Sequence, residues 1–178
     1  MNLLYSSPQI HTRIAELAEK ISKDYQGQSV LLMGVLKGCT IFMSHLLVQL
    51  KGDFEIDFLT VSSYGAGTES GELQIKTLPS RSVEAKTVLL VEDIVDSGKT
   101  VRFVQELLLK QGAKSVEVAT LIDKETEANV LVPKYVGFIY KEAPFIVGFG
   151  FDLNEKFRNL PDIYQLEPQD LPSSTSSE

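Results

Sequence analysis

Apolar residues recur along the chain in two patterns. In the first they return every three or four residues, as over 8–24, where Ser7 is the expected N-cap of a helix and Pro8 suits its first turn. In the second they form short continuous runs, such as SVLLMGV at 29–35, which are typical of a strand buried on both faces. The patterns predict helices over 8–24, 40–50 and 100–113. They predict strands over 29–35, 54–63, 72–78, 87–93, 115–123, 135–140 and 145–152.

The alternation of strands and helices predicts an α/β fold with a mainly parallel sheet flanked by helices. We detect no internal repeat, and we expect a single domain over 1–166, because 178 residues with 43% hydrophobic content suffice for one core. Residues 64–71, YGAGTESG, are rich in glycine and small polar groups and are expected to form a mobile loop. The polar tail 167–178 is expected to be disordered.

Composition narrows the class of protein. Apolar runs stop well short of the roughly 20 residues that a membrane span requires, and the N-terminus lacks a secretory pattern, so we expect a cytoplasmic protein that binds no membrane. The single cysteine, Cys39, excludes an internal disulfide and a cysteine-based zinc cluster, and the two separated histidines argue against a histidine metal site. The net charge of −7 argues against general binding of nucleic acid, although local amides and cations can still bind small anions.

The stretch VLLVEDIVDSGKT, residues 88–100, carries the chemistry. Its ending resembles an ATP-binding P-loop, but that motif needs glycine at position 93, where this chain has Asp93. Glu92 and Asp93 suit two vicinal hydroxyls, or Mg²⁺ held through water. Asp96 can act as a proton acceptor, and the amides of residues 97–100 can hold a phosphate at the start of a helix. The run therefore indicates a ribose 5-phosphate, whereas a single acid would indicate only a solvated turn that caps a helix.

This stretch resembles the phosphoribosyl pyrophosphate signature of the type I phosphoribosyltransferases, and residues 10–166 resemble the hypoxanthine-guanine branch of that family. The resemblance implies the type I phosphoribosyltransferase fold, with a small hood built from the N- and C-terminal segments. It implies transfer of a 5-phosphoribosyl group from phosphoribosyl pyrophosphate to hypoxanthine or guanine, giving IMP or GMP and pyrophosphate, with Mg²⁺ as cofactor. It also implies a homodimer or homotetramer.

The resemblance assigns roles to residues within and outside the acidic stretch. Within the stretch, the 5′-phosphate and ribose would be bound by Glu92, Asp93, Asp96, Ser97, Gly98, Lys99 and Thr100, with Asp96 catalytic. Pyrophosphate would be bound by Leu36, Lys37, Gly38 and Arg158, and the Leu36–Lys37 peptide can be cis in relatives. Ser63 and Tyr64 would open a flexible catalytic loop. The purine would be bound by Lys124, Phe145, Ile146 and Asp152, with Lys124 at the 6-oxo group, Phe145 stacked on the base and the Ile146 carbonyl facing a guanine amino group. The metal would be held near Glu92, Asp93 and Asp152.

Departures from the family pattern surround the base pocket. IYKEAPFIVG at 139–148 and Leu153 differ from the common residues, which leaves the preference among hypoxanthine, guanine and xanthine open. Cys39 stands where many relatives have a smaller residue. A regulator that uses the same fold to bind RNA is the alternative function, and the net charge of −7 argues against it because RNA binding relies on basic surface.

Overall fold

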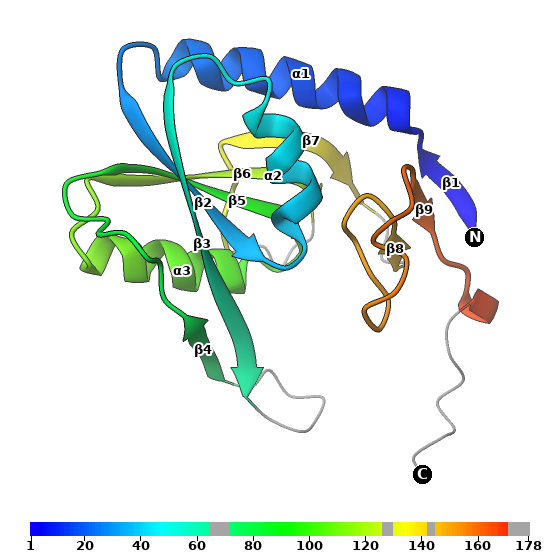
Figure 1. The fold of residues 1–178 in the computed structure, drawn as a ribbon. Helices are drawn as coiled ribbons and strands as arrows, with labels where there is room; N and C mark the ends of the chain where they lie inside the picture. Colours follow the sequence, from blue (N-terminus) through cyan, green and yellow to red (C-terminus); the bar gives the residue numbers. More distant parts are fainter. Residues whose placement is uncertain (65–71, 126–129, 142–144, 171–178) are drawn as a thin grey trace.

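A six-stranded sheet, five of whose strands run parallel, organises the computed structural model, which describes residues 1–64, 72–125, 130–141 and 145–170 (Figure 1). The strand order is β4-β3-β2-β5-β6-β7, and only β4 at one edge runs antiparallel to its neighbour. The strands are β2 (Ser29–Leu36), β3 (Asp53–Tyr64), β4 (Glu72–Thr77), β5 (Thr87–Val95), β6 (Ser115–Lys124) and β7 (Tyr135–Tyr140). The predicted α/β fold with a mainly parallel sheet is confirmed.

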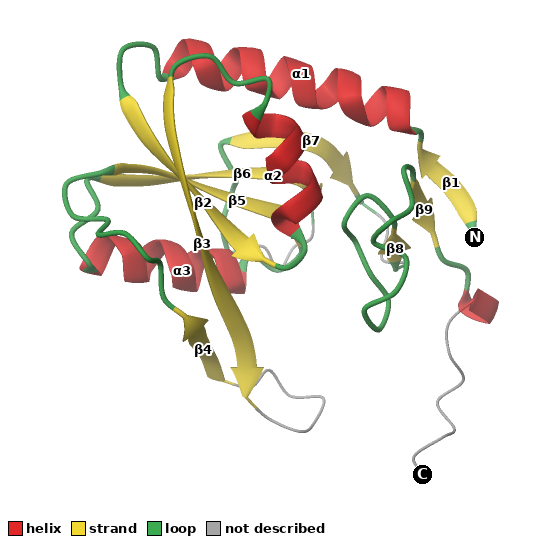
Figure 2. Ribbon diagram, viewed as in Figure 1, coloured by secondary structure: helices red, strands yellow, loops and turns green. Residues whose placement is uncertain are grey.

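Helices cover both faces of the sheet (Figure 2). Helices α1 (Ser7–Asp24) and α2 (Cys39–Leu47) pack on one face, and α3 (Lys99–Lys110) packs on the other. Alternate residues of β2 serve the two cores: Leu32 packs with α1 and α2, whereas Leu31 and Met33 pack with α3. This division explains why the strand is a continuous apolar run, since neither of its faces meets water.

The hood is a separate three-stranded sheet formed from both ends of the described chain (Figure 1). Its strands are β1 (Asn2–Tyr5), β8 (Ile146–Val147) and β9 (Ile163–Gln165), in the order β1-β9-β8. A short 3₁₀ helix, η1 (Pro168–Asp170), follows β9, and the Met1 ammonium donates to Asp170 at 2.7 Å. Residues 168–170 of the tail that was expected to be disordered therefore form a helical turn, and residues 171–178 lie outside the described residues.

Four local predictions are corrected by the structure. Helix α1 is capped one residue earlier than expected: the backbone N–H and the hydroxyl of Ser6 both donate to Gln9 Oε1. The strand expected over 145–152 ends at Val147, because Gly148, Phe149 and Gly150 all have φ between +51° and +102°, which bends the chain out of an extended path. Helix α2 ends at Leu47 instead of residue 50, and α3 spans Lys99–Lys110, just short of Gly112.

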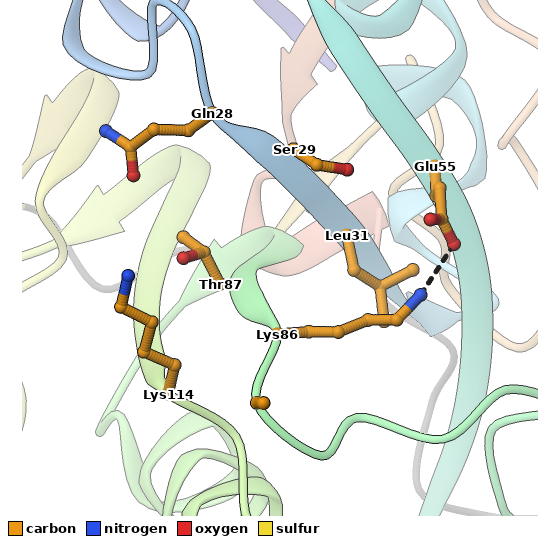
Figure 3. A pocket seen from close by; sticks show the side chains of 8 residues that line it. Gln28, Ser29, Leu31, Glu55, Lys86, Thr87 and Lys114 are labelled. Carbon is orange, nitrogen blue, oxygen red and sulfur yellow. Dashed lines mark hydrogen bonds and ion pairs between the residues drawn. The ribbon is translucent and has the colours of Figure 1, made fainter.

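A polar cavity of about 280 Å³ lies at the amino ends of the strands (Figure 3). Its lining residues are Gln28, Ser29, Leu31, Glu55, Ala85, Lys86, Thr87 and Lys114. The Lys86 ammonium lies 2.7 Å from Glu55 Oε2, and no residue of the acidic stretch at 88–100 lines this cavity. The candidate chemistry lies at the opposite edge.

Among the described residues no helix is both long and apolar enough to cross a membrane.

Candidate active site

The predicted site residues gather at the carboxyl ends of three adjacent parallel strands. In the sheet β2 lies beside β5, and β5 lies beside β6. Leu36 ends β2 and is followed by Lys37 and Gly38, residues 96–100 follow β5, and Lys124 ends β6. Ligands of open α/β sheets bind at this edge, because the loops that leave the strands meet there.

The loop between β5 and α3 forms a cradle for an anion. It lines a cavity of about 240 Å³ with Glu92, Ile94, Val95, Asp96, Ser97, Gly98, Lys99, Thr100 and Val101. Gly98 has φ of +74°, a left-handed conformation that favours glycine, and it leads directly into the first turn of α3. Among the described residues the N-cap Gly98 offers no capping side chain, and the Lys99 N–H makes only a long contact of 3.5 Å with the Ser97 hydroxyl, so amides of the first turn can turn to a phosphate. All four residues predicted for the 5′-phosphate line this cavity.

The acidic pair near the end of β5 consists of a half-buried Glu92 and a buried Asp93. Asp93 is 7% exposed and accepts a hydrogen bond from the Ile94 N–H at 2.9 Å. Among the described residues, Glu92 Oε2 is buried and has no hydrogen-bond partner. Burial and the adjacent Asp93 raise the pKa of Glu92 well above its usual range, and burial raises the pKa of Asp93 to about 6. Two adjacent acids, one half-buried and one buried, with an unused oxygen on Glu92 are suited to hydroxyl donors or to a cation.

Three acids, Glu92, Asp93 and Asp152, were predicted to lie near a metal ion. No group of three or more histidine, cysteine or acidic side chains is close enough to hold a metal ion in the part of the chain that is described. Asp152 is instead engaged by Arg158, whose Nη2 lies 2.7 Å from its Oδ1. The pair Glu92 and Asp93 still fits Mg²⁺, which is commonly held by one or two carboxylates together with the phosphates of a substrate.

Asp96 and Lys124 come together across the gap between β5 and β6. Val95 and Asp123 are paired in register, so the residues that follow them lie side by side. The Lys124 ammonium donates to Asp96 Oδ2 at 3.4 Å. The Asp96 side chain is 66% exposed and that of Lys124 only 14%, so the carboxylate faces the opening and the ammonium lies deeper. A carboxylate, which was predicted to accept a proton, and an ammonium therefore lie next to each other at one end of the cradle.

The loop after β2 approaches the acidic pair closely. The Leu36–Lys37 peptide is cis. A Cβ on Gly38 would overlap the Asp93 carboxylate, and a Cβ on Gly150 would lie 2.8 Å from the Gly38 carbonyl oxygen. Glycine at both positions allows three distant segments, the loop after β2, the end of β5 and the turn after β8, to meet without a side chain between them.

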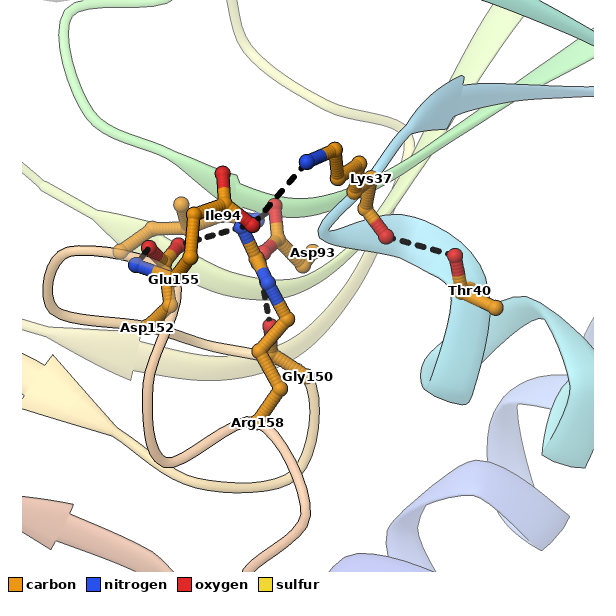
Figure 4. Close-up of polar contacts among 8 residues, drawn as sticks. All are labelled: Lys37, Thr40, Asp93, Ile94, Gly150, Asp152, Glu155 and Arg158. Atoms are coloured by element: carbon orange, nitrogen blue, oxygen red, sulfur yellow. Dashed lines mark hydrogen bonds and ion pairs between the residues drawn. The ribbon is translucent and has the colours of Figure 1, made fainter.

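Arg158 is the centre of a charged network beside this loop (Figure 4). Its Nη1 donates to the Gly150 carbonyl at 2.7 Å, and its Nη2 contacts Asp152 at 2.7 Å and Glu155 at 3.5 Å. Glu155 Oε2 also accepts from the Lys37 ammonium at 3.1 Å. The two cations predicted for pyrophosphate thus lie on either side of one carboxylate.

The remaining predicted residues have definite places. Phe145 precedes β8, and its side chain is 57% exposed. Ile146 is buried in β8 and pairs with Gln165 of β9. The backbones of Ser63 and Tyr64 form the end of β3, so the strand extends into the expected loop, while residues 65–71 lie outside the described residues. The purine, loop and phosphate roles of these residues stay predictions.

Sequence reasoning missed three contributors to the site. Glu155 and Gly150 lie inside the motif at 145–161, and the spacing of Glu155 to Arg158, three residues apart with opposite charges, was a signal for a contact. Thr120 is fully buried in β6, and its hydroxyl lies 3.3 Å from the Asp93 carbonyl. It gave no signal, because a threonine in a strand is ordinary.

Cys39, the departure at the start of α2, is buried against the site. Burial and the nearby Glu92 and Asp93 raise the pKa of its thiol, so it remains protonated and packs as a small apolar group.

Comparisons with known proteins agree with this geometry. A model of the phosphoribosyl transferase domain matches residues 2–153. A hypoxanthine-guanine phosphoribosyltransferase of Staphylococcus aureus is 41% identical over 171 residues, which cover 94% of each chain. The Listeria innocua bifunctional protein TilS/HprT is 43% identical over 169 residues, but the chain spans only 26% of its length.

Solved structures are similarly close. The crystal structure of a hypoxanthine phosphoribosyltransferase from Staphylococcus aureus matches with a TM-score of 0.89 at 40% identity, covering 94% of this chain and 92% of that one. A hypoxanthine-guanine phosphoribosyltransferase from Bacillus anthracis, solved with HEPES in its active site, matches with a TM-score of 0.88 at 36% identity, covering 94% and 99%. The chain belongs to the hypoxanthine-guanine branch of the phosphoribosyltransferase family.

Proposed function

We propose that the protein transfers the 5-phosphoribosyl group of phosphoribosyl pyrophosphate to hypoxanthine or guanine, giving IMP or GMP and pyrophosphate, in the presence of Mg²⁺. The observation that carries the proposal is the convergence of four chemically distinct groups at one edge of the sheet. These are the cradle at 97–100, the adjacent acids Glu92 and Asp93, the pair Asp96 and Lys124, and the cations Lys37 and Arg158. Each matches one part of the substrates.

The donor is held by its three parts. The amides at the start of α3 bind the 5′-phosphate, because the helix terminus favours negative charge there. The unpartnered oxygen of Glu92 and the carboxylate of Asp93 accept hydrogen bonds from the ribose hydroxyls. Mg²⁺, when bound with the donor near Glu92 and Asp93, neutralises charge on the pyrophosphate oxygens and so favours departure of the leaving group.

The chemical step breaks the bond between ribose C1 and a pyrophosphate oxygen, and the electron pair leaves with pyrophosphate. The purine N9 electron pair forms the new bond to C1, and the purine N7 proton passes to Asp96. The exposed carboxylate of Asp96 also faces the positive charge that develops on the ribose ring. Lys124 donates to the purine 6-oxo group; an amino group at that position would offer it no acceptor, and this favours 6-oxopurines.

The experiment is a steady-state assay with phosphoribosyl pyrophosphate, Mg²⁺ and each purine base in turn, on the wild type and on Asp96→Asn. We expect the variant to keep its far-UV circular dichroism and to lose about 10²- to 10⁴-fold in kcat, the usual effect of losing a general acid–base group. Near-normal turnover by Asp96→Asn would refute its role as proton acceptor. Tight binding of RNA by a wild type that transfers no phosphoribosyl group would favour the regulator instead.

A further inference from the structure

Two cations of the proposed pyrophosphate site already have an anion between them. Glu155 Oε2 lies 3.1 Å from the Lys37 ammonium and 3.5 Å from Arg158 Nη2 (Figure 4). The contact with Lys37 is the main cause that holds the pKa of Glu155 below its usual range, so the group is ionised at neutral pH. An ionised carboxylate oxygen between a lysine and an arginine is chemically equivalent to one oxygen of a pyrophosphate.

The backbone that presents Glu155 is a tight two-residue turn. Leu153 and Lys156 exchange backbone hydrogen bonds of 3.2 and 3.1 Å, and the residues between them, Asn154 and Glu155, have φ of +53° and +63°. Such turns favour Asn followed by Gly, because both central residues are left-handed. Glutamate at the second position carries a conformational cost that glycine would avoid. The turn therefore carries the Glu155 side chain at a position where the backbone conformation favours glycine.

Arg158 does not depend on Glu155 for its position. Its Nη1 donates to the Gly150 carbonyl and its Nη2 contacts Asp152, both at 2.7 Å, so the longer contact with Glu155 is the weakest of the three. The Arg158 Nε is buried and has no hydrogen-bond partner among the described residues, so its N–H can still donate to a ligand. Arg158 would remain in place when Glu155 leaves.

We propose that Glu155 is a placeholder for pyrophosphate: its carboxylate bridges Lys37 and Arg158 in the free protein, and the pyrophosphate group of the donor displaces it. The proposal rests on the proposed function, because it concerns the same anion site. Glu155 thereby weakens the binding of both the donor and the pyrophosphate product. It is a residue that sets affinity, and it does not touch the reacting atoms.

The size of the effect follows from exposure. The Lys37 and Glu155 side chains are 67% and 62% exposed, and ion pairs at such sites are weak. Removing the competing charge should therefore tighten binding by about 2- to 10-fold rather than by orders of magnitude. A residue that merely positioned Lys37 would have the opposite sign, since its loss would loosen the site.

The test is Glu155→Gln, which keeps the shape and the backbone strain but removes the charge. Titration calorimetry with inorganic pyrophosphate and Mg²⁺ should give a dissociation constant about 2- to 10-fold lower than that of the wild type, and the KM for phosphoribosyl pyrophosphate should fall similarly. Glu117→Gln is the matched control, because Glu117 is an ion-paired carboxylate near the amino end of β6, away from the site, 3.6 Å from Lys134. Unchanged or weaker binding by Glu155→Gln would overturn the proposal.

A second comparison assigns the effect to the bridge. In a Lys37→Met background, which removes one of the two cations, the gain from Glu155→Gln should shrink. An equal gain in both backgrounds would mean that Glu155 does not act against Lys37 and would also overturn the proposal. A wild type that binds pyrophosphate but transfers no phosphoribosyl group would refute the proposed function, while the calorimetry would still decide the role of Glu155. A wild type that binds no pyrophosphate would refute both.

Discussion

Replacing Asp93 with asparagine should make the metal-free protein more stable near neutral pH. Asp93 is 7% exposed, and burial raises its pKa from an ordinary value of 3.8 to about 6. The folded state therefore binds the Asp93 proton more tightly than the unfolded state. The contribution of protonated Asp93 to the free energy of unfolding is fully present below about pH 3.8 and is lost as the pH rises through about 6. Asparagine has the shape of the protonated acid, can still accept from the Ile94 N–H, and carries no charge to bury.

The magnitude follows from the difference between the two pKa values. At about 1.36 kcal/mol per pH unit, the interval from 3.8 to about 6 corresponds to about 3 kcal/mol near pH 7. Near pH 4.5 most of the difference has disappeared, and about 1 kcal/mol remains. The pKa of the adjacent Glu92 is also raised, so its ionisation lowers the free energy of unfolding in the same direction as the pH rises.

The assay is urea unfolding in EDTA, followed by far-UV circular dichroism because the chain has no tryptophan. The free energy of unfolding of Asp93→Asn should exceed that of the wild type near pH 7, and the two should converge as the pH is lowered. Asp53→Asn, at an exposed carboxylate, is the control and should change stability by less than about 0.5 kcal/mol. A variant less stable than the wild type near pH 7, or a difference independent of pH, would refute the reasoning. The same variant should use phosphoribosyl pyrophosphate poorly, because the buried charge that lowers stability lies at the proposed ligand site and is absent from the variant.

Other substitutions test separate parts of the structure. Lys124→Ala should raise the KM for 6-oxopurines at least about 10-fold while changing that for phosphoribosyl pyrophosphate much less, and equal losses for both would contradict its base-reading role. Gly38→Ala puts a methyl group into the Asp93 carboxylate and should weaken pyrophosphate binding by about 10-fold or more in calorimetry; normal binding would show that the loop can shift. Tyr135→Phe removes the hydroxyl that donates to Asp24 at 3.0 Å, and should lower the free energy of unfolding by about 1 kcal/mol in urea. An unchanged midpoint would mean that solvent replaces this bond.

Local sequence was sufficient for the elements of the main sheet. The run at 29–35 was recognisable as a strand because both of its faces are buried, as Leu31 and Leu32 show from opposite sides of the sheet. The acidic stretch could be interpreted because its chemistry is contiguous. Residues 92 and 94–100, which line one cavity and are proposed to bind one ligand, follow one another in the chain, and position on a strand end determines where they point.

The resemblance to the family implied a hood, but hydrophobic periodicity did not predict its strands, because they are too short to show a period. Strands β1 and β9 have four and three residues, and they pair from opposite ends of the described chain, so neither stretch indicates its partner. The turn after β8 was predicted as a strand because FIVGFGF is apolar throughout. Its glycines allow the left-handed φ values that bend it instead.

Contacts between distant segments depend on how the whole chain packs. Glu155 is an unremarkable acid in a polar stretch until folding places it beside Lys37, 118 residues away. Asp93 is recognisable from its neighbours as a ligand residue, but its raised pKa arises from burial among segments that include Gly38. Periodicity and short motifs encode elements because they act between neighbouring residues. The charge state and competition within the site come from burial and proximity, which exist only once β2, β5 and the hood have come together.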